Sequence, residues 1–135
     1  MKKLQKFFIL LLTVFMLNVV NVSQLVHADA PPQDAQNQLD IVATAYAPGA
    51  HDNGKWGDLT HMGTKVRPGV VAVDPNVIPL GSRVYIQFAD GHGVYAQAED
   101  TGGAIKGNRI DIAMSSVDEA NDFGMKNVTV FVLNK

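Results

Sequence analysis

Two aspartates flank a glycine-rich stretch and are the residues best suited to acid–base chemistry. Asp100 ends one expected strand and Asp111 lies in the next, and the residues between them include Gly102, Gly103 and Gly107. Glycines adopt backbone conformations that other residues avoid, and they leave room for a ligand to approach the main chain. Two carboxyl groups beside such a loop are suited to giving and taking protons.

The strand pattern around Asp111 predicts the direction of its side chain. Ile110 and Ile112 alternate with Asp111. Because successive side chains of a strand point to opposite faces, the isoleucines share one face and Asp111 takes the other. The sequence therefore predicts a carboxylate that projects from a rigid strand beside a flexible loop.

Other interpretations of these residues are weaker or less specific. The run Asp-Thr-Gly-Gly at 100–103 is also a common turn, in which the aspartate accepts hydrogen bonds from backbone N–H groups. A phosphate-binding P-loop fits poorly, because Asn108 and Arg109 stand where Lys and Ser or Thr are required. His51 and His61 match no zinc-ligand spacing and residues 52–54 are not an EF-hand loop, so no metal and no cofactor is predicted.

Residues 1–28 have the plan of a secretory signal peptide. Three lysines precede an apolar run from Phe7 to Val20, and Val26 and Ala28 favour cleavage after Ala28. The run is short for a membrane span, which needs about 20 residues, although an uncleaved anchor is the alternative. The sequence predicts a secreted protein, extracellular or associated with the cell wall, that has no membrane contact after cleavage.

Charge and cysteine content exclude several classes of protein. Removal of the leader takes away three lysines and no acidic residue, so the formal charge falls from −2 to −5. The remaining basic residues are scattered singly, and a nucleic-acid partner is not expected. The chain has no cysteine, so it has neither disulfides nor a thiol nucleophile.

The rest of the chain predicts a mainly β domain at 39–135, preceded by a disordered leader at 29–38. Strands are expected at 40–47, in two short segments within 65–74, and at 83–88, 94–99, 109–113 and 127–133, with a hairpin turn at Asp90-Gly91. One short helix is expected, because Ser116 and Glu119 have the spacing of a capping box and Gly124 supplies a stop. Six or seven short strands with one helix indicate a closed or nearly closed barrel.

Several motifs in order and spacing resemble the 3D (three-aspartate) domain, the family shared by the catalytic core of membrane-bound lytic transglycosylase A and the Gram-positive stationary-phase survival proteins, which are similar to resuscitation-promoting factors. The matching residues are Ala45-Tyr46 and the segments 69–75, 77–81, 100–107 and 109–111. This resemblance implies a six-stranded double-psi β barrel that acts on peptidoglycan glycan strands. The three aspartates of the family match Asp74, Asp100 and Asp111, and the last of these is implied to be the catalytic acid/base.

The implied reaction needs one carboxyl group that changes its protonation state. Asp111 would protonate the oxygen that links N-acetylmuramic acid to N-acetylglucosamine, and would then take the proton of the muramoyl O6 hydroxyl as a 1,6-anhydro ring closes. An aspartate with its ordinary pKa near 3.9 is ionised at neutral pH, so burial and a nearby carboxylate, for which Asp100 is the candidate, are expected to raise its pKa. Asp74 is expected to orient the strand ends or to hydrogen-bond in the same groove, or to serve the turn before Pro75.

Six further residues are expected to bind the glycan: Tyr46, Trp56, Thr101, Gly102, Gly103 and Lys106. An exposed Trp56 would stack on a sugar ring, although a tryptophan that fixes a long loop to the core is the alternative. Two other functions stay open. One is an inverting glycoside hydrolase, whose acid and base carboxyls lie about 6.5–9.5 Å apart. The other is a non-catalytic wall-binding module of the expansin type.

Overall fold

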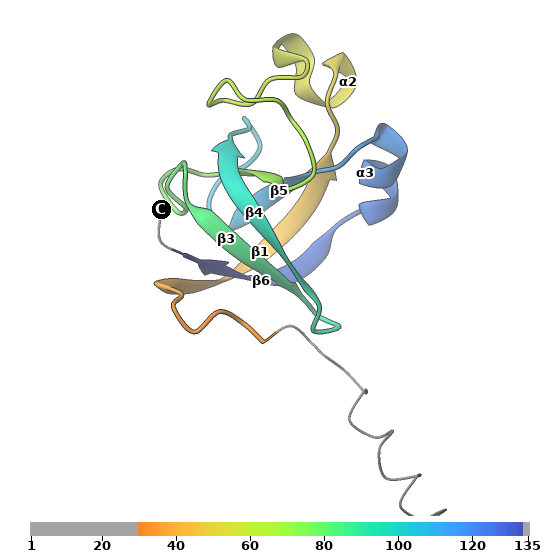
Figure 1. The fold of residues 1–135 in the computed structure, drawn as a ribbon. Helices are drawn as coiled ribbons and strands as arrows, with labels where there is room; N and C mark the ends of the chain where they lie inside the picture. The colour runs from red at the N-terminus through yellow and green to blue at the C-terminus, as the bar shows by residue number, and fades with distance from the viewer. Residues whose placement is uncertain (1–29, 134–135) are drawn as a thin grey trace, which may run out of the picture.

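The computed structural model describes residues 30–133 (Figure 1). The expected signal peptide at 1–28 lies outside the described residues. Six strands, two short α-helices and one 3₁₀ helix follow in the order β1 (Asn37–Tyr46), α2 (Ala50–Asn53), η1 (Gly54–Trp56), β2 (Val70–Val73), β3 (Arg83–Phe88), β4 (Gly93–Asp100), β5 (Arg109–Ala113), α3 (Val117–Phe123) and β6 (Lys126–Val132).

The six strands close into one barrel in the order β1-β5-β2-β4-β3-β6, and β6 pairs again with β1. The pairs β1/β5 and β2/β4 are parallel, whereas the other four pairs are antiparallel. This arrangement confirms the prediction of a mainly β, six-stranded double-psi barrel. Loop residues 47–69, which include α2 and η1, rise above one end of the barrel, and α3 lies on its side (Figure 1).

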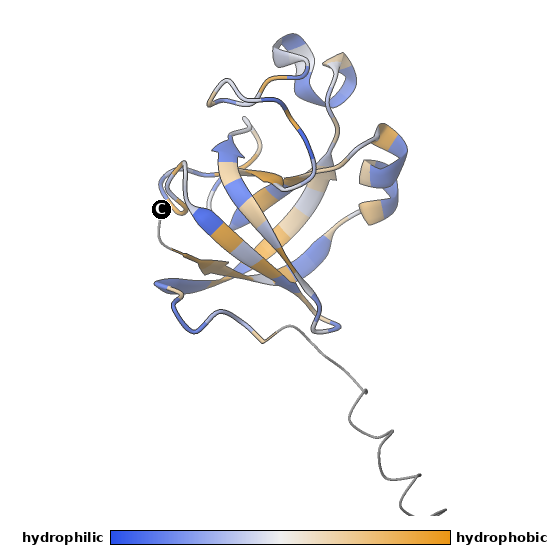
Figure 2. Cartoon of the chain, in the orientation of Figure 1, coloured by the Kyte–Doolittle hydropathy of each residue, from blue (hydrophilic) through white to orange (hydrophobic). Residues whose placement is uncertain are grey.

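Alternation along the strands fills the barrel interior with apolar side chains. Orange and blue bands follow one another along the strands in Figure 2, as expected when one face of each strand is buried and the other faces outward. The interior is made largely of β-branched residues, which suit a pleated, buried surface. Its fully buried members include Val71, Val73, Val84, Ile86, Ile110 and Val130.

Three details differ from the sequence-based prediction. Strand β1 begins at Asn37 rather than after the expected leader, because β6 offers pairing partners as far as Val132. The expected strand segment near Lys65 is reduced to a single bridge with Leu59. Helix α2 was not expected, and one short helix was predicted where the described chain has two. No side chain caps the N-terminus of α2, so its sequence carries no start signal.

Helix α3 has the predicted ends. The Ser116 side chain accepts a hydrogen bond from the Glu119 backbone N–H at 3.2 Å, and Gly124 stops the helix with a φ of 64°. The Glu119 carboxylate accepts from the Ser115 N–H at 3.0 Å, one residue before the partner of a standard capping box. Between residues 30 and 133, no helix has the length and the apolar content needed to cross a bilayer.

Candidate functional site

The strand register brings Asp111 and Asp100 into one row across the barrel wall. Asp111 pairs with Thr44 of β1 on one side and with Ala72 of β2 on the other, and Ala72 pairs in turn with Asp100 of β4. Residues paired in this way share a face of the sheet. The two aspartates are therefore two strands apart, about 10 Å between backbones, and only the small side chain of Ala72 stands between them.

Asp100 faces outward because β4 carries a bulge. Ala96 and Ala98 point into the barrel, and simple alternation would send Asp100 inward as well. The register shifts between Val71 and Ala72, so that Glu99 is an extra residue and both acidic side chains turn toward the loop at 47–69. Bulges commonly redirect a side chain at a functional site, and this one was not predictable from alternation.

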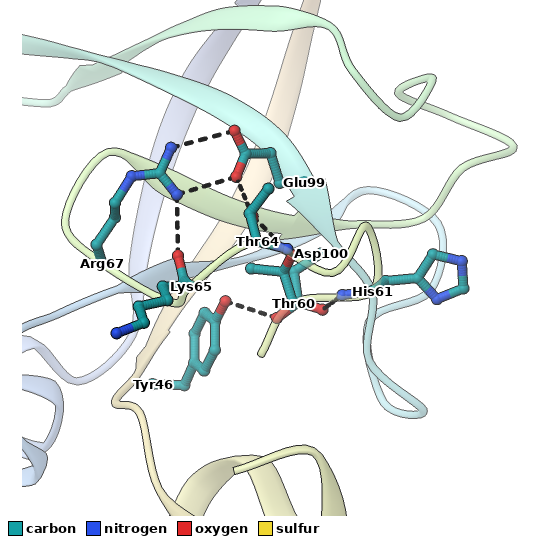
Figure 3. A network of polar contacts seen from close by, with 8 residues as sticks. All are labelled: Tyr46, Thr60, His61, Thr64, Lys65, Arg67, Glu99 and Asp100. Carbon is teal, nitrogen blue, oxygen red and sulfur yellow. Dashed lines mark hydrogen bonds and ion pairs between the residues drawn. The ribbon is translucent and has the colours of Figure 1, made fainter. Parts of the chain in front are cut away.

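Three donors hold the Asp100 carboxylate in place. The Tyr46 hydroxyl donates to Oδ2 at 2.7 Å and the His61 N–H donates to Oδ1 at 2.8 Å (Figure 3). The Thr101 N–H also donates to Oδ1 at 2.8 Å. Asp100 itself is only 4% exposed. Burial, followed by the hydrogen bond to Asp100, raises the pKa of Tyr46, so the phenol stays protonated and donates. Asp100 therefore joins β1 to both loops that border the site.

An ion pair on the outer side of the same network fixes the loop at 47–69 further. Arg67 donates to both carboxylate oxygens of Glu99, at 3.0 and 3.2 Å, and Thr64 donates to the same carboxylate at 2.5 Å (Figure 3). These hydrogen bonds lower the pKa of Glu99, with Arg67 as the larger cause. The bulge thus gives two neighbouring acids different roles, because Glu99 is ion-paired whereas Asp100 is bound by neutral donors.

Asp111 has the environment of a carboxyl group that holds its proton more strongly than usual. Its side chain is half-buried, and the Thr44 hydroxyl donates to Oδ1 at 2.8 Å. Burial raises the pKa of Asp111, and the negative charges of Asp52 and Asp100 add to this effect against the Thr44 hydrogen bond and the charge of Arg109. The direction is the one that a general acid requires.

Asp74, the third aspartate, connects two turns through the hydrogen bonds that its carboxylate accepts. It accepts from the Asn76 backbone at 3.0 Å, from the Asn76 side chain at 3.1 Å and from the Gly107 N–H at 2.8 Å. Gly107 has a φ of 63°, which favours glycine. Both carboxylate oxygens are engaged, and Asp74 therefore fixes the end of the loop at 101–108.

A small apolar cluster outside the barrel holds both loops against the wall. We call it the outer cluster; it consists of Tyr46, Val66, Val70, Ala72, Ile105 and Ala113. Val66 comes from the loop at 47–69 and Ile105 from the loop at 101–108, whereas the other four belong to strands β1, β2 and β5. The loops are thus packed on the same surface that carries Asp100 and Asp111.

The two loops enclose an open, polar cavity of about 390 Å³. Its lining comes from α2, η1, the residue that ends β4 and the loop at 101–108, and consists of Asp52, Asn53, Trp56, His61, Asp100, Thr101, Gly102, Gly103 and Lys106. Trp56 is 59% exposed, with the Lys55 ammonium 5.2 Å from its ring centroid. The cavity therefore combines an exposed aromatic ring, polar side chains and carboxylates, which suits a polar ligand with flat apolar faces.

The structure brings together most of the predicted site residues. Thr101, Gly102, Gly103, Lys106 and Trp56 line the cavity with Asp100. Tyr46 is only 6% exposed and lies behind Asp100, so it positions that carboxylate instead of facing a ligand. Asp111 is not among the residues that line the cavity; the strand row described above connects it, through Ala72, to Asp100, which does line it. Asp74 lies apart from this lining, at the far end of the loop at 101–108.

The predicted site residues did not include Asp52, His61 or Thr44. Asp52 lines the cavity and acts on Asp111, while the His61 ring approaches the Thr101 hydroxyl at 3.2 Å. The two loop residues are separated from their partners by about 40 or more positions, and no local signal marks such contacts. Among residues 30–133, no three His, Cys, Asp or Glu side chains come close enough to hold a metal ion together.

The first prediction concerns the fit of Gly102 against the outer cluster. A Cβ at Gly102 would lie 2.8 Å from Cγ1 of Ile105, whereas a Cβ at Gly103 would meet nothing within 4 Å. Gly102→Ala is expected to displace Ile105 and to lower stability by about 1–3 kcal/mol, as overpacking does. Gly103→Ala is the matched control and should change stability by less than about 0.5 kcal/mol. Urea unfolding of both variants measures this, and equal losses would contradict the packing described.

The second prediction concerns Asp74 and pH. Backbone donors, above all the Gly107 N–H, lower the pKa of Asp74. Its folded-state pKa then lies below the unfolded one, so its stabilising effect is present above the unfolded pKa and is lost as pH falls through the folded value. Asp74→Asn should therefore be less stable than the wild type at neutral pH, and the difference should shrink in acid, at a pH below the ordinary aspartate pKa of about 3.9. Urea unfolding at both pH values measures this difference, with Asp34→Asn, a change at an exposed acid, as the control. A stability difference between Asp74→Asn and the wild type that does not depend on pH would contradict the prediction.

The second half of the chain matches a known protein family. A family model described as the 3D domain matches residues 69–134. The cell wall-binding protein YocH of Bacillus subtilis is 46% identical over 112 residues, which are 81% of this chain and 37% of YocH. The putative cell wall shaping protein YabE of the same organism is 52% identical over 65 residues, 48% of this chain and 15% of YabE. The chain thus spans well under half the length of these relatives.

Two of the similar solved structures share the fold of the barrel. The Streptomyces papain inhibitor covers 74% of this chain and 97% of its own, at a TM-score of 0.53 and 16% identity. The apo expansin of Clavibacter michiganensis aligns with 73% of this chain and 52% of its own length, with a TM-score of 0.52 and 16% identity. The crystal structure of MltA from E. coli aligns with 57% of this chain and 27% of its own length, with a TM-score of 0.49 and 24% identity. The likeness to the papain inhibitor and to the expansin concerns the fold alone.

Proposed function

This chain belongs to the 3D domain family through residues 69–134, and from that premise we propose that it binds the glycan strands of peptidoglycan and cleaves them as a lytic transglycosylase. The proposed product is a 1,6-anhydromuramoyl end. Asp111 is the proposed catalytic acid/base. Secretion and a place at the cell wall are part of the same proposal, and the names of YocH and YabE as wall-binding and wall-shaping proteins support it.

The observation that carries the proposal is the environment of Asp111. A half-buried carboxyl with a raised pKa shares a strand row with Asp100, a second carboxylate that lines a polar cavity of about 390 Å³. A carboxyl that keeps its proton at higher pH is suited to protonate a glycosidic oxygen, and the carboxylate left behind is suited to accept the proton of the O6 hydroxyl. The reaction then needs no water and no second titrating group.

The remaining residues have supporting roles in this mechanism. Asp100 holds the two loops and contributes negative charge beside Asp111. The backbone donors of the loop at 101–108, together with Lys106, are placed to bind sugar hydroxyl or acetamido groups, and Trp56 offers a ring face. Asp74 acts at a distance by fixing the end of that loop. The catalytic role among the three aspartates thus falls to Asp111 alone.

The proposal is tested on purified sacculi. Protein that contains residues 29–135 is incubated with them, and the soluble fraction is examined by mass spectrometry for anhydromuropeptides. Their time-dependent release supports cleavage. Binding to sacculi without any release supports the second candidate, a wall-binding module without catalysis, which the name of YocH as a wall-binding protein and the full hydrogen bonding of Asp100 favour.

The third prediction separates glycan binding from chemistry. Trp56→Ala is expected to weaken binding to sacculi about 2–10-fold, since an aromatic contact contributes about 0.5–1.5 kcal/mol. Met125→Ala is the control, because Met125 is 65% exposed but does not line the cavity. A co-sedimentation isotherm measures both. Equal affinity of the Trp56 variant and the wild type would remove Trp56 from the proposed binding surface.

A further inference from the structure

Arg109 is the first residue of β5, two residues before Asp111, and its side chain is on the same face of the strand. Ile110 and Ile112 point into the barrel, so Arg109 and Asp111 both point outward. Two residues along a strand span about 6.6 Å, which places the bases of the two side chains near each other. Arg109 is half-buried. A guanidinium and the proposed acid therefore lie side by side on the outer wall of the barrel.

The three arginines of the chain differ in what their guanidinium groups contact. Arg67 donates to both carboxylate oxygens of Glu99, at 3.0 and 3.2 Å, and Arg83 lies over Tyr95, 4.3 Å from the ring centroid. Within residues 30–133, Arg109 has neither an ion pair nor an aromatic partner, and its buried Nε has no hydrogen bond. Buried donors without an acceptor are uncommon in proteins, so this one calls for a functional explanation.

The neighbouring carboxylates are bound by other donors. Continued by one residue, the register of β2 and β5 puts Asp74 opposite Arg109, but both Asp74 oxygens accept hydrogen bonds from the two turns described above. Asp111 Oδ1 accepts from the Thr44 hydroxyl. The Arg109 backbone is fixed, because its N–H donates to the Gly107 carbonyl at 2.8 Å. A rigid strand thus presents a guanidinium that no neighbouring acid neutralises through an ion pair.

A guanidinium is suited to bind carboxylates, because its planar fork of N–H groups can donate two parallel hydrogen bonds to one carboxylate. Of the two sugars in a peptidoglycan strand, only N-acetylmuramic acid has a substituent that carries carboxyl groups. This substituent is the lactyl group, which is a free carboxylate in a bare strand and is joined to the peptide stem elsewhere. The bond that Asp111 is proposed to cleave begins at this same sugar.

We propose that Arg109 is a specificity-determining residue, which binds a carboxylate of the muramoyl substituent and so places the bond of that sugar at Asp111. The identity of this ligand rests on the proposed function. The carboxylate has two sources, the lactyl group of a bare strand or the first residues of the peptide stem, and both offer the same chemistry to the guanidinium. Chitin sugars, which have no lactyl group, would lack the contact.

The test is an NMR titration of protein that contains residues 29–135 with disaccharides that end in N-acetylmuramic acid. These ligands lack the bond from N-acetylmuramic acid to N-acetylglucosamine, so they are not cleaved. One has the free lactyl carboxylate, one has a neutral lactyl methylamide, and one has alanyl-glutamate joined to the lactyl group. An anionic form should bind about 3–30-fold more tightly than the methylamide, as expected for a charged hydrogen-bonded pair that is partly exposed. The anionic form that is preferred identifies the source, and equal affinity for all three would overturn the inference.

Arg109→Gln should abolish this preference. Arg109→Lys should keep part of it, because an ammonium retains the charge and loses the fork. Arg83→Gln is the matched control, an arginine of β3 that lies over Tyr95, and should keep the full preference. An undiminished preference in folded Arg109→Gln would overturn the inference. If that variant does not fold, the wild type is titrated in low and in high salt, where the preference should shrink with salt; a preference that does not depend on salt would overturn the inference.

These titrations involve no turnover, so their outcome is distinct from that of the sacculus experiment. Intact sacculi together with a carboxylate preference that depends on Arg109 would contradict cleavage and support the contact. Cleavage of sacculi without such a preference would support the proposed function and overturn the role of Arg109.

Discussion

Replacing Asp111 by asparagine is expected to abolish glycan cleavage while the fold persists. Loss of a general acid typically lowers a rate by about 10²–10⁴-fold, and here the same group also serves as the base. The amide oxygen of asparagine can still accept the Thr44 hydroxyl, so the local geometry is retained. Release of muropeptides from sacculi measures the effect, with Asp118→Asn, an exposed acid of α3, as control.

The direction of the stability change in Asp111→Asn can be predicted separately from its effect on cleavage. Burial raises the pKa of Asp111, so ionisation disfavours the folded state as pH rises through the folded pKa. Asparagine cannot ionise, and the variant should be at least as stable as the wild type at neutral pH. In the wild type, cleavage should fall as pH rises above the pKa of Asp111, because the reaction begins from the protonated form. A variant that is inactive because it is unfolded would not test the proposal, and a thermal melt detects that case.

Asp100→Ala is expected to have the largest effect on stability. It leaves the Tyr46 hydroxyl and the N–H groups of His61 and Thr101 without their acceptor. Unsatisfied buried donors cost about 1–3 kcal/mol each, and since His61 is exposed and Thr101 partly exposed, a total of about 2–4 kcal/mol is expected. In a domain of this size the melting temperature should fall by about 10–20 °C.

A double-mutant cycle with Tyr46→Phe isolates one of these contacts. Phenylalanine keeps the ring in the outer cluster and removes the hydroxyl, so the coupling with Asp100→Ala reports the hydrogen bond of 2.7 Å. We expect a coupling of about 1.5–3 kcal/mol, as for hydrogen bonds to charged groups. Additive losses in the two variants would mean that Tyr46 does not hold Asp100, and Asp34→Ala controls for removal of an exposed acid.

Alternation predicted the face of Asp111 because β5 is regular. Its isoleucines enter the barrel, and no irregularity intervenes. The same rule fails at Asp100, where the register shift between Val71 and Ala72 inserts Glu99 and turns both acids outward. A bulge depends on the partner strand, which is 26 or more residues away in the chain, so the local sequence of β4 does not reveal it.

The contacts of the loop at 47–69 could not be predicted from the sequence for a related reason. Asp52 lies with Asp100 in the cavity lining only because the loop at 47–69 folds over the barrel end, and that fold depends on the outer cluster and on Asp100. These are tertiary contacts between segments with no periodic pattern. By contrast, α3 and the hairpin at Asp90-Gly91 depend on local capping and turn residues, and both were predicted with their correct positions.

Cleavage of sacculi in water enriched in heavy oxygen tests the central claim most directly, by mass spectrometry of the new glycan ends. If Asp111 both gives and takes the proton within one sugar, every new end is a 1,6-anhydromuramoyl end without heavy oxygen, and Asp111→Asn produces none. Reducing ends that carry heavy oxygen would instead indicate attack by water, as in an inverting hydrolase. Either those ends, or anhydro ends still formed by Asp111→Asn, would contradict the mechanism.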